Sequence, residues 1–387
     1  MTEHYIDLAK PLFWIVCGVG FLLLTPVTSA RPRQWVWCGV NVLFLALLLP
    51  PALVGGILVA VVAVYLLLVL VQRQKWKTIA AALLAGSTLA LFLIHKLPQF
   101  SGVIGLGGLA SLLTLLGFSY TALRTIDVLR AVDAKRAPAP DLISTFNYLL
   151  PFHMLAAGPI QSYEDFARAS AVPQPLSREN ALVAMEWISR GLMKKFVLAY
   201  ILQKIFLTDF RAGIAYSMFE AQVFAIWLFL DFSGYSDIAV GVGTLLGIAT
   251  PLNFNRPYLA RNMIDYWERW HITLSQFIRR NVFIPIQLWL MRITDGDRPL
   301  LTASLALSAS FILCGLWHSI SVRFLVWGIL HATGLVTVYL YQHFLRRKLG
   351  ARGLKQYLED KRIRVLSTIL TFEYVAFSLV VMLYPVQ

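Results

Sequence analysis

Long apolar stretches separated by short polar turns fill most of the 387-residue chain. A helix needs roughly 20 mainly apolar residues to cross about 30 Å of hydrocarbon. Stretches of this kind are residues 11–27, 36–49, 53–71, 78–94, 103–123, 184–207, 217–232, 300–317, 324–345 and 367–383. The pattern predicts an all-α, polytopic membrane protein with about eleven transmembrane helices plus re-entrant segments. We expect a single integral-membrane domain over residues 1–387.

Residues 142–160 form an apolar stretch that is interrupted by Pro151, His153 and the pair Gly158-Pro159. Proline removes a backbone donor and breaks a helix. A membrane tolerates such a break only where neighbouring protein or water satisfies the freed backbone groups. We therefore expect a broken or re-entrant segment here.

The central third of the chain is too polar for a plain spanning helix and too apolar for an exposed loop. Gly234 allows a helix break, after which Asp231 and Asp237 would cap a new N-terminus or pair with Arg256 or Arg261. We favour a structural role for this acidic cluster. Because polar groups at membrane depth usually face the protein interior, the segment is expected to line an interior site.

Composition and charge support this interpretation. Hydrophobic residues make up 58% of the chain and charged residues only 14%, whereas about a quarter of a soluble domain is charged. The formal net charge is +14, and the basic residues concentrate in alternate loops. This is the positive-inside pattern, which places the basic loops in the cytoplasm and both termini outside it. A nucleic-acid partner is not expected, because no basic stripe interleaved with aromatic residues is present.

His318 is the leading candidate for catalysis, because it follows an uncharged run of eighteen residues, 300–317. A neutral imidazole can survive burial and take a proton from a hydroxyl as a general base. The alternative is an interfacial histidine that is hydrogen-bonded to a carbonyl at a helix end. If Arg298 lies inside, the run carries His318 about 27 Å toward the outer face. A cytoplasmic donor would then reach it only through a funnel or a thinned barrier.

His271 is the second candidate, in a polar and aromatic run. On a continuous helix, Arg261, Asp265 and Arg269 would form an ion-pair ladder at i+4 spacing. Trp267, His271 and Ser275 would share the neighbouring face at the same spacing. The alternative is a structural interfacial helix anchored by tryptophan and arginine. His331 could be a packing histidine or a partner of the site, and no histidine spacing predicts a metal site.

Five motifs resemble the ordered signature of the membrane-bound O-acyltransferase family, over residues 119–334. They are Gly158-Pro-Ile with Tyr163 and Phe166, Asp231-Phe-Ser-Gly-Tyr-Ser-Asp, Asn253-Phe-Asn-Arg-Pro-Tyr-Leu, Tyr266-Trp-Glu-Arg-Trp-His-Ile-Thr-Leu-Ser, and Gly315-Leu-Trp-His. The resemblance implies a helical ring around a central funnel. By motif, His318 corresponds to the catalytic histidine and His271 to a second functional histidine. Such a funnel would resolve the depth problem of His318.

Within this family the chain is similar to two bacterial branches, the D-alanyl-transfer protein of teichoic-acid D-alanylation and the alginate O-acetyltransferase type. The residues of the second and third motifs favour the acetyl branch. The segment Gln287-Leu-Trp-Leu-Met-Arg, the 47-residue separation of the two histidines and the total length favour the D-alanyl branch. We lean to the D-alanyl branch, whose members lie in the bacterial inner membrane.

The resemblance implies acyl transfer from a cytoplasmic thioester to a hydroxyl presented from the outer side. The donor is an acyl carrier protein or coenzyme A, with no tightly bound cofactor and no metal. The acceptor is an envelope glycopolymer, reached directly or through an extracytoplasmic partner enzyme. The expected substrate-binding residues are Asp265, Arg269, Ser275, Trp317, Ser319 and Asn255. A transporter or flippase is the alternative from another class, since broken helices at the midplane are typical of transporters.

Overall fold

The computed structural model describes residues 8, 10–73, 75–103, 105–115, 117–172, 177–206 and 214–383. The described part is helical, and it contains no strand. The expected all-α class is therefore confirmed. Six of its helices are long and apolar enough to cross a membrane, or seven if a bent pair at residues 107–133 counts as one span. The expected count of eleven is not confirmed.

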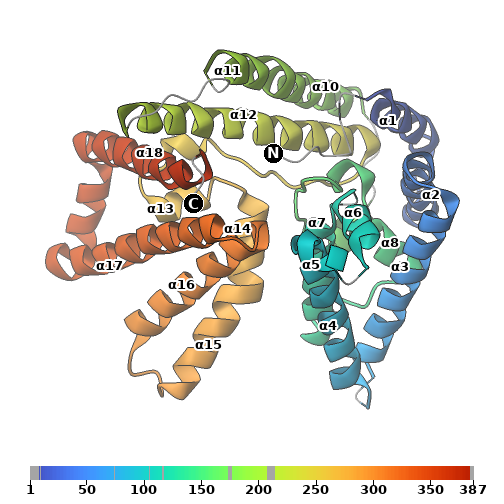
Figure 1. Cartoon of the computed structure of the whole chain (residues 1–387), viewed down its shortest axis with the longest axis horizontal. Helices are drawn as coiled ribbons and strands as arrows, with labels where there is room; N and C mark the ends of the chain where they lie inside the picture. The colour runs from blue at the N-terminus through green and yellow to red at the C-terminus, as the bar shows by residue number, and fades with distance from the viewer. Residues whose placement is uncertain are drawn as a thin grey trace. The chain divides into compact units, whose positions relative to one another are not determined.

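The helices divide into two compact units, and α12 contributes to both (Figure 1). The first unit contains α1 (Pro11–Leu24), α2 (Ala30–Leu48), α3 (Pro51–Val71), α4 (Lys77–Lys96), α5 (Pro98–Val103), α6 (Gly107–Leu115), α7 (Phe118–Asp133), α8 (Leu142–Leu149), the 3₁₀ turn η1 (Phe152–Met154), α9 (Tyr163–Ala171), α10 (Arg178–Leu192) and the last part of α12 (Ile214–Leu246). The second contains η2 (Met193–Leu198), α11 (Ala199–Phe206), the rest of α12, η3 (Pro257–Leu259), α13 (Met263–Trp267), α14 (Ile272–Ile278), η4 (Arg279–Phe283), α15 (Ile284–Ile293), α16 (Pro299–His318), α17 (Val322–Glu359) and α18 (Lys361–Leu383).

The apolar stretch at residues 103–123 is not the single span that its hydropathy predicts. Gly117 adopts a left-handed conformation, φ 58°, and the helices on either side of it meet at 79°. A Cβ at Gly117 would lie 2.3 Å from the carbonyl oxygen of Leu155. The bend therefore depends on a residue without a side chain, because only glycine combines this conformation with this close approach.

The broken segment at residues 142–160 is confirmed, and Arg124 of α7 satisfies part of its backbone. The buried guanidinium donates hydrogen bonds to the carbonyl oxygens of Met154 (2.9 Å), Pro159 (3.2 Å) and Leu149 (3.4 Å). A buried carbonyl without a partner costs about 1–3 kcal/mol. The non-helical backbone is thus held by a neighbouring helix, as a membrane interior requires.

The expected helix break at Gly234 is wrong, because α12 continues through it to Leu246. The two carboxylates that bound this motif do not cap a new helix. Asp231 pairs with Lys195 of η2, and Asp237 pairs with Arg190 of α10 at 2.9 Å. Pairing with basic side chains stabilises these charges within the long helix, which supports the structural role expected for the cluster. The partners are Lys195 and Arg190, and not the expected Arg256 or Arg261.

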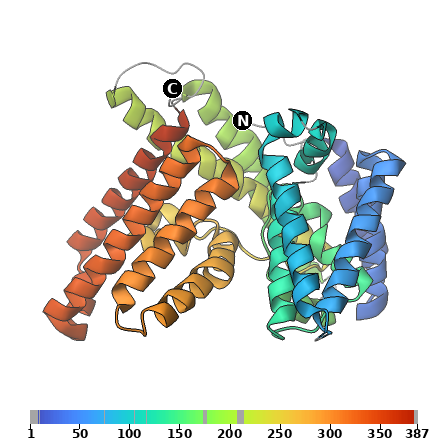
Figure 2. The same ribbon diagram turned by 60° about the horizontal axis from the view of Figure 1, so that its bottom comes forward.

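In the second unit, α16 and α17 form a tight hairpin, with α18 beside α17 (Figure 2). A Cβ at Gly315 would lie 2.2 Å from the carbonyl oxygen of Phe324, and one at Gly328 would lie 2.7 Å from that of Phe311. Small residues at a helix crossing allow two backbones to approach this closely. The crossing places the end of α16 directly against the first turns of α17.

Helix α17 is too long to be one straight span, since its 38 residues would extend about 57 Å. It bends at Gly350, where φ is 66° and ψ is 179°. The hydroxyls of Tyr341 and Tyr357 meet at 3.0 Å across this bend, although they would be about 24 Å apart along a straight helix. The bend lies within the basic segment at residues 346–364, so the two parts of that segment run in different directions.

Candidate active site

His318 is the last residue of α16, and aromatic rings surround its imidazole. The ring centroids of Trp317, Trp327 and Phe324 lie 4.6, 5.5 and 5.6 Å from that of the imidazole. Phe324 is stacked on it at 23°, and Trp327 stands edge-on at 87°. The histidine itself is only half-buried. It is thus a titratable group at a helix end, in an aromatic cage that leaves part of the residue exposed.

The close crossing of α16 and α17 builds this cage. His318 and Trp317 come from α16, while Phe324 and Trp327 come from the first two turns of α17. Gly315 lies three residues before His318, and a Cβ added there would clash with the backbone of α17. The Gly315-Leu-Trp-His motif therefore has two structural roles. The glycine allows α16 and α17 to approach closely, and this approach places the aromatic rings of α17 against His318.

His271 is not part of a continuous helix, so the expected single face of Trp267, His271 and Ser275 is wrong. The residue adopts a left-handed conformation, φ 43°, between α13 and α14. Ser275 turns its hydroxyl back to the carbonyl oxygen of Trp270 at 3.4 Å. Such a conformation is costly for a residue with a side chain and persists only where its surroundings hold it.

Those surroundings are Asn253, Thr273 and Phe232. The Nδ1 atom of His271 lies 3.1 Å from Oδ1 of Asn253, and Phe232 of α12 meets the imidazole edge-on at 4.8 Å. His271 is 2% exposed. Burial lowers the pKa of His271 well below its usual value, and the charge on His318 lowers it further. At neutral pH the residue is therefore a neutral imidazole that interacts electrostatically with His318.

The expected ion-pair ladder is present on the stretch before His271. Asp265 accepts from Nε of Arg269 at 2.6 Å and from Nε of Arg261 at 3.3 Å. Burial raises the pKa of Asp265, but the bonds from Arg269 and Arg261 outweigh it and lower that pKa below its usual value. The carboxylate is thus ionised. It links Arg261, which precedes α13, to Arg269 in the turn that follows α13.

His331 of α17 is buried and fully hydrogen-bonded. The indole N–H of Trp267 donates to its Nδ1 at 3.2 Å, its Nε2 lies 3.0 Å from Oγ of Ser378, and that hydroxyl donates to the carbonyl oxygen of Val375 at 2.7 Å. Its ring lies 4.3 Å from that of Trp327, one wall of the His318 cage. His331 is thus a neutral structural partner that links α13, α17 and α18 behind the cage.

The remaining expected binding residues have different surroundings. Trp317 belongs to the cage, and the half-buried Ser319 follows His318 at the C-cap of α16. Asn255 is exposed, and its backbone N–H donates to the carbonyl oxygen of Arg269 at 2.9 Å. His318, Trp317 and His271 thus lie in the same unit as Asp265 and Arg269, whose charged groups are engaged with each other.

Sequence reasoning missed Asn253, Thr273 and the α17 residues Phe324 and Trp327. Asn253 lies in the third motif, eighteen residues before His271. Neither helical nor strand periodicity places two residues at this separation in contact. The motif itself carried a signal, because it contains two asparagines and only the second, Asn255, was expected to have a role.

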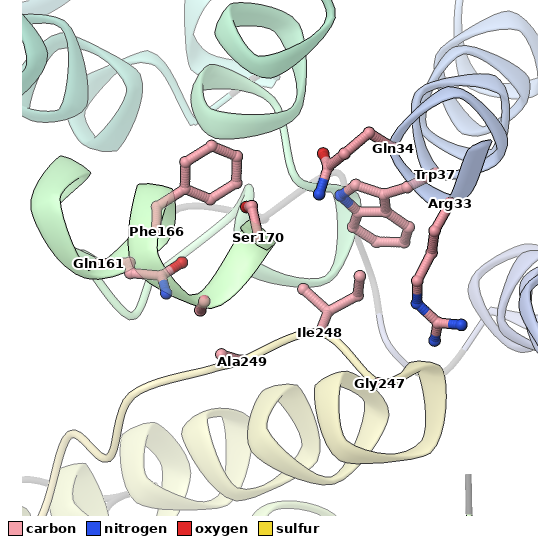
Figure 3. A pocket seen from close by; sticks show the side chains of 10 residues that line it. Arg33, Gln34, Trp37, Gln161, Phe166, Ser170, Gly247, Ile248 and Ala249 are labelled. Atoms are coloured by element: carbon pink, nitrogen blue, oxygen red, sulfur yellow. The ribbon is translucent and has the colours of Figure 1, made fainter. Parts of the chain in front are cut away.

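A small cleft lies apart from these residues, in the first unit (Figure 3). Its volume is about 30 Å³, which is room for one water molecule. Arg33 lines it but donates its N–H groups to the carbonyl oxygens of Leu24, Val27 and Leu246. The cleft therefore marks the place where a buried arginine caps the ends of α1 and α12. No group of three or more potential metal ligands is present in the described part of the chain.

Residues 56–358 match the sequence profile of the membrane-bound O-acyltransferase family, so the chain belongs to this family and is an acyltransferase. A teichoic acid D-alanyltransferase of Bacillus subtilis is 25% identical over 383 residues, 95% of each chain. A peptidoglycan O-acetyltransferase of Helicobacter pylori is 33% identical over 203 residues, 51% of this chain and 37% of its own. A Pseudomonas fluorescens protein named "Probable alginate O-acetylase AlgI" is 28% identical over 243 residues, 59% of this chain and 45% of its own. The expected family and its two branches are confirmed, and the transporter alternative is not retained.

Proposed function

We propose that the chain transfers a D-alanyl group from a carrier-protein thioester across the bacterial cytoplasmic membrane to a hydroxyl of a cell-envelope glycopolymer or partner protein. Likeness over 95% of both chains to a teichoic acid D-alanyltransferase supports this choice of acyl group. The observation that carries the proposal is the half-buried His318 in its aromatic cage, with the neutral His271 in the same unit.

His318 acts as the general base. It takes the proton of the acceptor hydroxyl as the oxygen attacks the thioester carbonyl carbon. The carbon–sulfur bond then breaks, and the leaving thiolate takes the proton from the imidazolium. Phe324, whose ring is stacked on the imidazole, stabilises the transient cation, because a positive charge is attracted to the face of an aromatic ring. His271 orients one of the reactants from the neighbouring turn.

The carrier docks on the basic elbow, which we define as residues 346–364, where α17 bends and α18 begins. Eight basic side chains of this segment are exposed: Arg346, Arg347, Lys348, Arg352, Lys355, Lys361, Arg362 and Arg364. Its two carboxylates are already engaged, since Glu359 lies 3.8 Å from Lys355 and Asp360 accepts from the first N–H groups of α18. The remaining positive charge attracts an acidic carrier or the phosphates of coenzyme A. By the positive-inside pattern this face is cytoplasmic and both termini are extracytoplasmic.

O-acetyl transfer from acetyl-coenzyme A to an envelope glycan is the second candidate. Its support is the 33% identity to a peptidoglycan O-acetyltransferase, although that match covers 51% of this chain. Both candidates use the same base and the same thioester chemistry. They differ in the donor and in the group transferred.

The purified protein in lipid nanodiscs discriminates between these activities. It is incubated with radiolabelled D-alanyl carrier protein or with radiolabelled acetyl-coenzyme A, each with a hydroxyl-bearing envelope polymer and the extracytoplasmic fraction. We expect label in the polymer or partner from the D-alanyl carrier alone. Label from acetyl-coenzyme A alone would support the second candidate, and intact thioester in both reactions would contradict acyl transfer.

A further inference from the structure

The side-chain oxygen of Asn253 is the meeting point of three hydrogen bonds. Oδ1 lies 3.1 Å from Nδ1 of His271, 2.8 Å from Oγ1 of Thr273 and 3.3 Å from the backbone nitrogen of Thr273. The carbonyl oxygen of Asn253 also accepts from the backbone N–H of Ile272 at 2.9 Å. Asn253 is 2% exposed. One buried asparagine thus holds both the side chain and the backbone of the His271 turn.

These contacts decide which nitrogen of His271 carries the proton. A backbone N–H can only donate, so the atom of Asn253 that faces Thr273 must be the amide oxygen and not the amide nitrogen. An oxygen acceptor in that position requires a proton on Nδ1 of His271. In a neutral imidazole one nitrogen donates and the other accepts, so the lone pair of His271 lies on Nε2.

We infer that Asn253 is a positioning residue that fixes His271 as the Nδ1–H tautomer, with Nε2 as the hydrogen-bond acceptor toward the reactants. This inference rests on the proposed acyl transfer for its chemical meaning. A hydroxyl that donates to Nε2 would present its oxygen in a defined direction, which is what an orienting group contributes. The hydroxyl and the backbone N–H of Thr273 donate to the same oxygen, so its position does not depend on the bond to His271 alone.

An uncharged partner suits this task better than a carboxylate. A carboxylate beside Nδ1–H favours the imidazolium, which has no lone pair. Asparagine fixes the same tautomer without favouring the charge. The titratable group that acts on His271 from another element is His318 of α16, whose charge disfavours a second imidazolium. Burial and this repulsion keep His271 neutral, while Asn253, from the connection between α12 and η3, fixes its tautomer.

The test combines a spectroscopic measurement with a pH profile. Nitrogen-15 NMR of histidine-labelled protein in nanodiscs, with His271 assigned by its loss in His271→Gln, reports the tautomer directly. We expect a protonated Nδ1 and an unprotonated Nε2 for His271 in the wild type. An Nε2–H tautomer would overturn the inference, whatever the protein transfers.

Asn253→Asp provides the second measurement, with Asn180→Asp at the start of α10 as the matched control. The added carboxylate should raise the pKa of His271, so the nitrogen-15 titration of its imidazole should move to higher pH by about 1–3 units. The control should leave that titration in place. An unchanged His271 titration in Asn253→Asp would contradict the inference. If the wild type transfers nothing while the NMR result holds, the proposed function fails and the positioning role of Asn253 stands.

Discussion

The crossing of α16 and α17 predicts that Gly315→Ala disables the site without touching a histidine. The added Cβ would lie 2.2 Å from the carbonyl oxygen of Phe324 and 3.2 Å from Cα of Gly328. Non-bonded carbon atoms prefer separations of about 3.5–4.0 Å, so the two helices must move apart by about 1 Å. Both nearby atoms belong to the backbone of α17, which cannot rotate out of the way.

The expected cost has two parts. Overpacking of a close-packed contact usually costs about 1–3 kcal/mol of folding free energy. The same shift separates Trp327 and Phe324 from His318, and a misplacement of about 1 Å can reduce a rate by about 10²-fold. We therefore expect a lower melting temperature together with a much lower transfer rate.

The assay measures thermal unfolding and acyl transfer on purified protein, with Gly39→Ala of α2 as the matched control. A Cβ at Gly39 meets nothing within 4 Å, so this variant should unfold and react like the wild type. A Gly315→Ala variant with wild-type stability and rate would refute the argument that the helix contact builds the cage.

Three further variants test the packing around the site. Asp265→Asn should lower stability at neutral pH by about 1–2 kcal/mol, and calorimetry should show that the difference disappears in acid. Because pairing lowers the pKa of Asp265, its contribution is present above the unfolded pKa of about 3.9 and is lost as pH falls through the lower folded value. His331→Phe should cost about 1–3 kcal/mol, because the indole N–H of Trp267 loses its acceptor and the hydroxyl of Ser378 loses one of its two partners. An unchanged melting curve would refute that. Arg124→Met should remove a hydrogen bond from each of three buried carbonyls and reduce the yield of folded protein on size-exclusion chromatography by severalfold, and a normal monodisperse peak would contradict the role of this arginine.

The features that depend on local chemistry were predictable from the sequence. The long apolar helix that ends at His318 follows from an uncharged run and its length. The broken stretch at residues 142–160 follows from its prolines and glycine. The ion pairs of Asp265 follow from i+4 spacing, although the helix they lie on is shorter than expected.

The features that depend on distant residues were not predictable. Spacing alone predicts that a helix runs through His271, but Asn253 holds the turn from eighteen residues away and stabilises a left-handed backbone there. Gly234 was expected to break a helix, but Lys195 and Arg190 pair with carboxylates on both sides of it, and α12 continues. In both places tertiary contacts override a local preference, as they often do.

The central claim is that His318 is the base of an acyl transfer, and His318→Gln tests it most directly. The wild type and the variant are compared for the initial rate of D-alanyl transfer from the carrier thioester. His343→Gln of α17 is the control, because it makes the same replacement of histidine by glutamine outside the site. Loss of a general base costs about 10²–10⁴-fold, so the variant should fall by this factor while its melting temperature and its binding of the carrier remain unchanged. A folded His318→Gln protein that transfers acyl groups at the wild-type rate would contradict the claim.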